Sequence, residues 1–263
     1  MMSKVTPYVD KFLEGMQSSG KTLYSRAIQN VRQMELDPDN GLKSGEVNTS
    51  IIAAVSGDIQ DFTDSSTYEA RVNALLDVIP KVAPQLITSA RNKFAPGSDI
   101  PSDLVDQIMN LADQYQGQLE AVTQDDAVFE AVGIPWADAA FQLVGQGASL
   151  ADIEGMTRGL QDALVSYYIT KVTTLLEQFE REAMELISDT FQVKLWLYAG
   201  PDDDRCREFC NFHVGNTYNE EEVAALGDDF LWSWDGMIPG TNPSNVAVNL
   251  GGYNCRHTLE PVK

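Results

Sequence analysis

The spacing of hydrophobic residues is helical up to about residue 190. Apolar side chains recur at intervals of three and four, so each stretch draws one stripe along a helix. The clearest stretch begins at a capping-box variant, Ser149–Asp152, and extends to about Ile187. Its stripe consists of Leu160, Leu164, Tyr168, Val172, Leu175 and Phe179. Similar stripes near residues 8–16, 23–31, 75–87 and 104–119 predict an elongated α-helical bundle over residues 1–192.

The pattern changes after Thr190. Residues 193–198 alternate like a strand and are rich in aromatic and β-branched side chains, and the run ends at Ala199-Gly200-Pro201. The stretch 193–263 also holds three of the four tryptophans. We therefore predict a mainly α protein in which the helical region, 1–192, is followed by a small, compact α+β module, 193–263.

Charge narrows the possible partners. The chain has 39 acidic and 18 basic residues, a net charge of −21 that is spread over its whole length. Binding of nucleic acid requires Lys and Arg to displace counterions, and anionic membranes attract basic segments for the same electrostatic reason. We therefore expect no direct nucleic-acid contact through the bulk surface and no membrane partner. No run approaches the ~18 apolar residues of a membrane span.

Residues 15–22 match the phosphate-loop pattern G-x4-G-K-[ST] letter for letter. Phosphate binding by this motif requires a buried strand before the loop and a helix after it. The residues before Gly15 instead carry a helical stripe. We therefore expect a helix–turn–helix corner with its break at Gly20, and no nucleotide site.

All three cysteines and both histidines fall between residues 206 and 257. Three of them are spaced so that they share one face if the segment is helical, and Cys255 and His257 share one side if their segment is a strand. Thiolates and imidazole together suit zinc. The candidate metal ligands are Cys206, Cys210, Cys255 and His257.

The spacing of these residues is less regular than a repeated C-x2-C motif, so other interpretations stay open. The cysteines could be buried thiols close enough to bridge, with His257 satisfied by hydrogen bonds. A nucleophile–base pair of Cys255 and His257 is a third interpretation, although no third orienting group is identifiable. The preceding run Asp202-Asp203-Asp204 could be a metal-binding carboxylate cluster, but after Gly-Pro it is more typical of a solvated turn or a helix N-cap, for a helix through Cys210.

Two segments of the tail form a recognisable pattern. The first has Asp202, Arg205, Cys210 and Gly215 in order, and the second reads Cys-Arg-His-Thr-Leu-Glu-Pro-Val over 255–262. Together they resemble the C-terminal module of tailed-phage head morphogenesis proteins, the minor head proteins of Mu-like and related phages. The resemblance covers about 65 residues. In many relatives a histidine stands where Gly252 is found, and a second cysteine where His257 is found.

The resemblance assigns motif positions to Arg205, Gly215, Arg256 and Pro261, besides Cys210, Cys255 and His257. It implies a structural or assembly protein of the capsid interior, near the portal, with a possible part in genome delivery. Its partners would be portal or capsid proteins, or a second copy bound through the helical stripes. Its location would be the virion, and the host cytoplasm during assembly. The alternative is a nuclease- or toxin-like hydrolytic enzyme that uses a Cys/His or zinc site.

Overall fold

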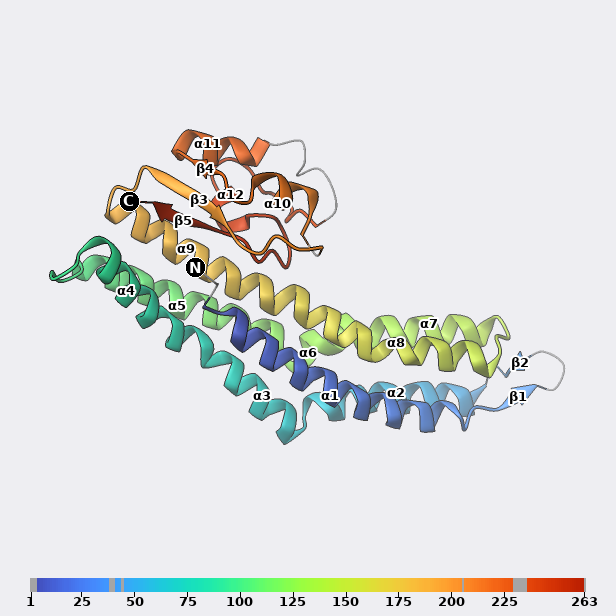
Figure 1. The fold of residues 1–263 in the computed structure, drawn as a ribbon. Coiled ribbons are helices and arrows are strands. Elements are labelled where there is room, and N and C mark those ends of the chain that lie inside the picture. The colour runs from blue at the N-terminus through green and yellow to red at the C-terminus, as the bar shows by residue number, and fades with distance from the viewer. Residues whose placement is uncertain (1–3, 38–40, 44, 205, 229–235, 263) are drawn as a thin grey trace. The chain divides into compact units, whose positions relative to one another are not determined.

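The computed structural model describes residues 4–37, 41–43, 45–204, 206–228 and 236–262. Arg205 therefore lies outside the described residues. The predicted fold class is confirmed, because the chain is mainly α with a small strand-containing region near residue 263 (Figure 1).

The longer helices occupy the first 190 residues. They are α1 Thr6–Val31, α2 Glu46–Thr63, α3 Ser66–Leu76, α4 Val78–Phe94, α5 Ser102–Thr123, α7 Ile134–Gly145, α8 Leu150–Tyr168 and α9 Thr174–Thr190. Shorter elements there are α6 Asp125–Val128, the π-helical turns η1 Phe129–Gly133 and η2 Ile169–Thr173, and the hairpin strands β1 Leu36–Asp37 and β2 Gly41–Leu42. The tail adds β3 Leu195–Ala199, α10 Glu208–His213, β4 Thr217–Tyr218, α11 Glu220–Ala225, the 3₁₀ turn η3 Leu226–Asp228, α12 Val246–Asn249 and β5 Thr258–Val262.

By compactness the chain forms two units. One contains residues 1–9, 76–119 and 170–263, and the other contains residues 10–75 and 120–169. The tail thus belongs to a unit that also contains helices, yet its buried residues form a hydrophobic cluster of their own, from Tyr198 to Leu259. The boundary between residues 192 and 193 stays a prediction.

Helix α1 continues through residues 15–22 without a break. The predicted corner at Gly20 is therefore wrong. A single glycine weakens a helix by only about 1 kcal/mol relative to alanine, and the fully buried side chains of Met16 and Leu23 outweigh that loss. The residues that match the phosphate-loop motif therefore form no loop, and their backbone N–H groups lie within the helix instead of facing a phosphate.

The predicted helix start at residue 149 is confirmed. The Ser149 side chain accepts a hydrogen bond from the Asp152 backbone N–H, and the Asp152 carboxylate accepts one from the Ser149 N–H at 2.9 Å. Farther along α8, the buried Tyr168 hydroxyl lies 2.6 Å from that of Tyr68. The Phe12 and Tyr168 rings form a T-shaped pair, so the three rings pack together in this unit's core.

Among the described residues, one helical stretch, Asp125–Gly145, is long and apolar enough to cross a membrane by length and composition alone. Its mean hydropathy is 1.2, and 33% of it is buried inside the structure. Helices from the cores of other proteins pass the same test, so this stretch is weak evidence for a membrane span.

The tail contains a three-stranded antiparallel sheet in the order β4–β3–β5. Trp196 in the central strand β3 faces Tyr218 in β4 and Pro261 in β5. Proline lacks a backbone N–H donor and is therefore tolerated in an edge strand such as β5. Figure 1 shows α10, α11 and α12 around this sheet. The sheet places the end of β3 next to the beginning of β5, where the cysteines and His257 lie.

Candidate functional site

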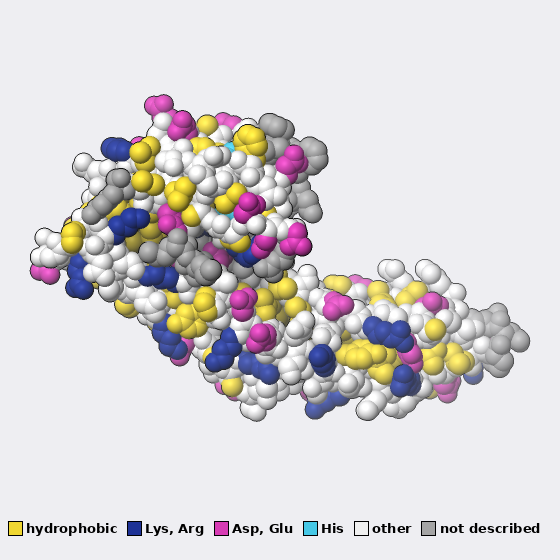
Figure 2. All heavy atoms as spheres, viewed as in Figure 1, with side chains coloured by type: hydrophobic (Ala, Val, Ile, Leu, Met, Phe, Trp, Pro, Cys, Tyr) yellow, Lys and Arg dark blue, Asp and Glu magenta, His cyan; other side chains and the backbone are white. Residues whose placement is uncertain are grey.

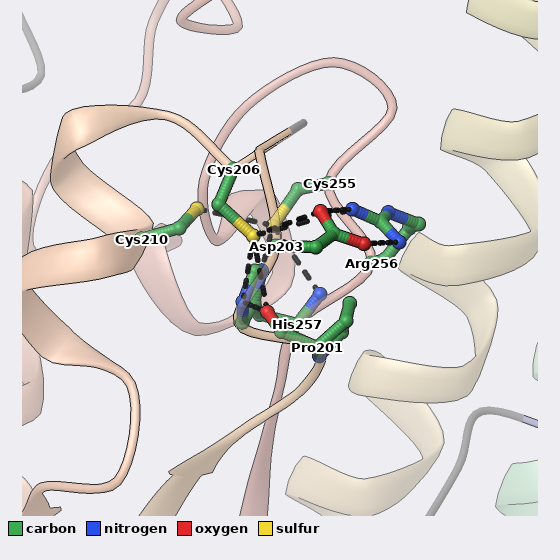
Figure 3. Close-up of polar contacts among 7 residues, drawn as sticks. All are labelled: Pro201, Asp203, Cys206, Cys210, Cys255, Arg256 and His257. Atoms are coloured by element: carbon green, nitrogen blue, oxygen red, sulfur yellow. Dashed lines mark hydrogen bonds and ion pairs between the residues drawn. The ribbon is translucent and has the colours of Figure 1, made fainter.

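The structure brings together three of the four predicted metal ligands. The Cys210 and Cys255 sulfurs lie 3.8 Å apart, and the Cys255 sulfur lies 3.6 Å from Nδ1 of His257. One ligand atom from each of the three lies within 4.8 Å of the others. All three side chains are buried, with 2%, 3% and 2% exposure for Cys210, Cys255 and His257. In Figure 3 the thiols converge beside the ring of His257.

A tight turn makes room for the two sulfurs. Cys210 lies on α10, and Cys255 lies in the turn before β5 that begins at Gly251. Gly251 has a φ of +67°, and a Cβ atom there would lie 2.7 Å from the Cys210 sulfur and closer still to that of Cys255. Only glycine fits both the backbone conformation and this contact.

Two arginines hold the turn by its backbone. Arg181 of α9, which is 3% exposed, donates hydrogen bonds to the carbonyls of Val248, Cys255 and His257. Arg207 donates to the carbonyls of Gly251 and Tyr253. These bonds satisfy buried acceptors that the turn itself cannot pair, and they fix the position of the Cys255 sulfur.

His257 has one nitrogen directed toward the backbone and the other toward the thiols. Its Nε2 lies 2.8 Å from the Pro201 carbonyl, which can only accept, so Nε2 carries the proton. Nδ1 is then the unprotonated nitrogen on the side of Cys255. This arrangement leaves a lone pair that can accept a thiol proton or bind a metal ion.

Cys206, the fourth predicted ligand, lies beside the group of three. Its thiol donates to the Pro201 carbonyl at 3.0 Å, and its sulfur is 3.8 Å from Nε2 of His257. It precedes α10, which begins at Glu208, so the predicted shared helical face of Cys206 and Cys210 is not formed. His213 lies on α10, and its Nδ1 is paired with the Tyr218 hydroxyl at 2.7 Å.

Each of the two buried thiols affects the pKa of the other. Burial alone would raise the pKa of Cys255, but the hydrogen bond from Cys210 and the Arg181 charge bring that pKa well below its ordinary value. The bond to Cys255, followed by burial, raises the pKa of Cys210. The arrangement therefore favours a Cys255 thiolate that accepts a hydrogen bond from the Cys210 thiol.

The described motif positions have structural contacts. Arg256 forms a bidentate ion pair with Asp203, with bonds of 2.9 and 2.6 Å (Figure 3). Gly215, with a φ of +82°, ends the turn after α10 and donates its N–H to the Tyr198 carbonyl. Pro261 lies in β5, and its carbonyl accepts from Lys93 at 2.6 Å.

The aspartate run lies in a bend and a turn, which agrees with one of its two predicted roles, but it does not cap α10. The N-cap of α10 is Arg207 and not an aspartate, since the helix begins only at Glu208. Asp203 instead holds Arg256. Sequence reasoning also missed Arg181, which follows a helical stripe and shows no local sign that it contacts residues 67 to 76 positions away.

Comparison with protein-family models, with curated proteins and with solved structures gives no match to this chain.

Proposed function

We propose that this protein is a structural or assembly protein of a tailed-phage head, located inside the capsid near the portal. The observation that carries the proposal is the 3.8 Å approach of the Cys210 and Cys255 sulfurs. Each cysteine belongs to one of the two segments on which the resemblance rests. Segments 45 residues apart have no reason to meet unless the tail folds as one unit, and the resemblance requires such a unit.

The other motif positions support the same conclusion. Arg256 holds the turn that contains Asp203, and Pro261 occupies the edge strand beside Trp196. Each of these residues contributes to the tail's internal structure, as expected of a module that serves assembly.

The hydrolytic alternative has less support from the site. A catalytic nucleophile must contact its substrate, and Cys255 and His257 are 3% and 2% exposed. The lowered pKa of Cys255 gives it thiolate character, but burial places that thiolate inside the tail. A buried thiolate held by hydrogen bonds fits a structural role better than a nucleophilic one.

The proposal is tested by deleting the gene from the phage genome that encodes it and examining the particles. We expect the protein in purified virions by mass spectrometry, and we expect the deletion to lower infectious titre with defective or empty heads. Complementation with the unmodified gene is the control. Virions that lack the protein, together with an unchanged titre after deletion, would overturn the proposal.

A further inference from the structure

We propose that the tail binds one zinc ion through the sulfurs of Cys210 and Cys255 and Nδ1 of His257, with Cys206 as the fourth ligand. This site is independent of the phage assignment, because it rests only on the positions of donor atoms within the tail.

Two of the distances between donor atoms match those of a tetrahedral zinc ion, and all three donor atoms lie within 4.8 Å of one another. Zn–S bonds of about 2.3 Å and Zn–N bonds of about 2.0–2.1 Å separate two sulfurs by about 3.8 Å, and a sulfur from a nitrogen by about 3.6 Å. The two sulfurs of Cys210 and Cys255 are 3.8 Å apart, and Cys255 and Nδ1 of His257 are 3.6 Å apart. Hydrogen-bonded thiols take a similar spacing, whereas a disulfide would bring the sulfurs to about 2.0 Å, so the observed distance fits a metal site and excludes a bridge.

The surroundings prepare His257 for a metal ion. A histidine that binds zinc usually donates its other N–H to a carbonyl or carboxylate, which fixes the ring and its tautomer. Here Nε2 is directed to the Pro201 carbonyl at 2.8 Å. The backbone of Gly200 also lies close to this ring, since a Cβ there would be 2.8 Å from Cγ of His257.

Cys206 completes the ligand set. Structural zinc sites are almost always bound by four protein ligands, and a Cys3His set is one of the common combinations. Cys206 is the remaining cysteine of the chain, and its sulfur lies 3.8 Å from Nε2 of His257, the ring nitrogen that is directed away from the ion. Rotation of its side chain away from the Pro201 carbonyl is required for it to reach the ion.

Metal analysis of the full chain, purified under reducing conditions with added Zn²⁺, tests the proposal. We expect one zinc ion per chain, and a tetrahedral absorption spectrum with thiolate charge transfer when Co²⁺ replaces zinc. Removing zinc with a chelator should lower the melting temperature, because structural zinc contributes directly to folding. A folded chain without zinc, or a Cys210–Cys255 disulfide under these conditions, would overturn the site.

Variants assign the ligands. Loss of a direct ligand in His257→Gln should weaken zinc affinity by about 100-fold or more, since loss of even an outer partner weakens it 10- to 100-fold. His213→Gln is the matched control, because His213 is the other buried histidine of the tail and should leave affinity unchanged. Equal affinity in both variants would overturn the assignment. If His257→Gln does not fold, cobalt binding by the unmodified chain still decides.

The fourth ligand has a separate readout. Cys206→Ser reduces three thiolates to two, so the cobalt charge-transfer intensity should fall by about one third while binding is retained. An unchanged intensity would overturn the part assigned to Cys206.

Discussion

Gly251 illustrates how little space surrounds the two buried sulfurs. Its backbone has a φ of +67°, and a side chain there would collide with both thiols. Gly240 has a similar backbone conformation, with a φ of +84°, but nothing lies within 4 Å of where its Cβ would be. Comparing substitutions at the two glycines therefore distinguishes the cost of backbone strain, which both share, from the cost of steric collision, which only Gly251 has.

We expect Gly251→Ala to destabilise the protein by more than about 3 kcal/mol, because it combines a left-handed backbone with overpacking against two sulfurs. Gly240→Ala should lose only about 1–2 kcal/mol, from the backbone alone. Urea unfolding of the two variants measures the difference. Equal losses would show that the space beside the thiols is not as tight as described.

Glu185 on α9 should make stability depend on pH. It lines a cavity of about 490 Å³, and burial, followed by the charges of Asp189 and Glu182, raises its pKa. A carboxyl whose pKa is raised in the folded state favours folding while protonated, and that contribution is lost as pH rises through the raised pKa. Glu185→Gln should therefore raise the melting temperature at pH 7. The corresponding gain in the free energy of unfolding should be less than about 1 kcal/mol. The gain should vanish below about pH 4, where the unmodified side chain is also neutral. Thermal melts at both values test this, and a gain that persists at the lower pH would contradict it.

At the scale of elements, α9 joins the helical part of its unit to the turn that contains Cys255. Its Arg181 donates to three carbonyls of residues 248–257 and is almost fully buried. One side chain thus organises a turn that has no regular secondary structure between α12 and β5.

Replacing Arg181 by methionine leaves three carbonyls without their donor, two of them in buried hydrogen bonds. At about 1 kcal/mol or more for each acceptor, Arg181→Met should destabilise the protein by at least about 3 kcal/mol. Arg158→Met is the matched control, since Arg158 is 64% exposed and its ion pair with Glu154 should contribute less than about 1 kcal/mol. Chemical denaturation compares them, and similar midpoints for the two variants would refute a structural role for Arg181.

Sequence patterns predict the helices and strands of this chain better than they predict where a helix is interrupted or which distant side chains come into contact. The stripe after Ser149 predicts the α8–α9 stretch because burial of one helix face dictates its periodicity. Gly20 misleads, since helix breaking by glycine is a weak local effect that core packing overrides. The approach of Cys210 to Cys255 follows from the clustering of cysteines and from the resemblance, whereas the contacts of Arg181 and Asp203 depend on tertiary structure that no local pattern encodes.

At the scale of the whole molecule, the net charge of −21 dominates long-range interactions. Figure 2 shows Asp and Glu side chains on the viewed surface, interspersed with Lys and Arg. Electrostatic repulsion between this acidic protein and packaged DNA would keep the protein off the genome inside a capsid, which agrees with the proposed function.

We therefore expect no salt-sensitive retention of double-stranded DNA in a gel-shift assay. Binding through phosphates weakens steeply as salt rises, so the assay is best run from about 50 to 200 mM salt. A basic DNA-binding domain of similar mass is the positive control. Tight binding at about 150 mM salt would remove the argument from charge.

The order of strands in the tail sheet has a consequence for synthesis on the ribosome. The central strand β3 pairs along its whole length with β5, from Leu195 with Val262 to Ala199 with Thr258. The nascent chain therefore exposes β3 and the thiols of Cys206 and Cys210 until some sixty further residues have been translated. Closure of the tail must be a late event, completed only after the ribosome has released residues 255–262.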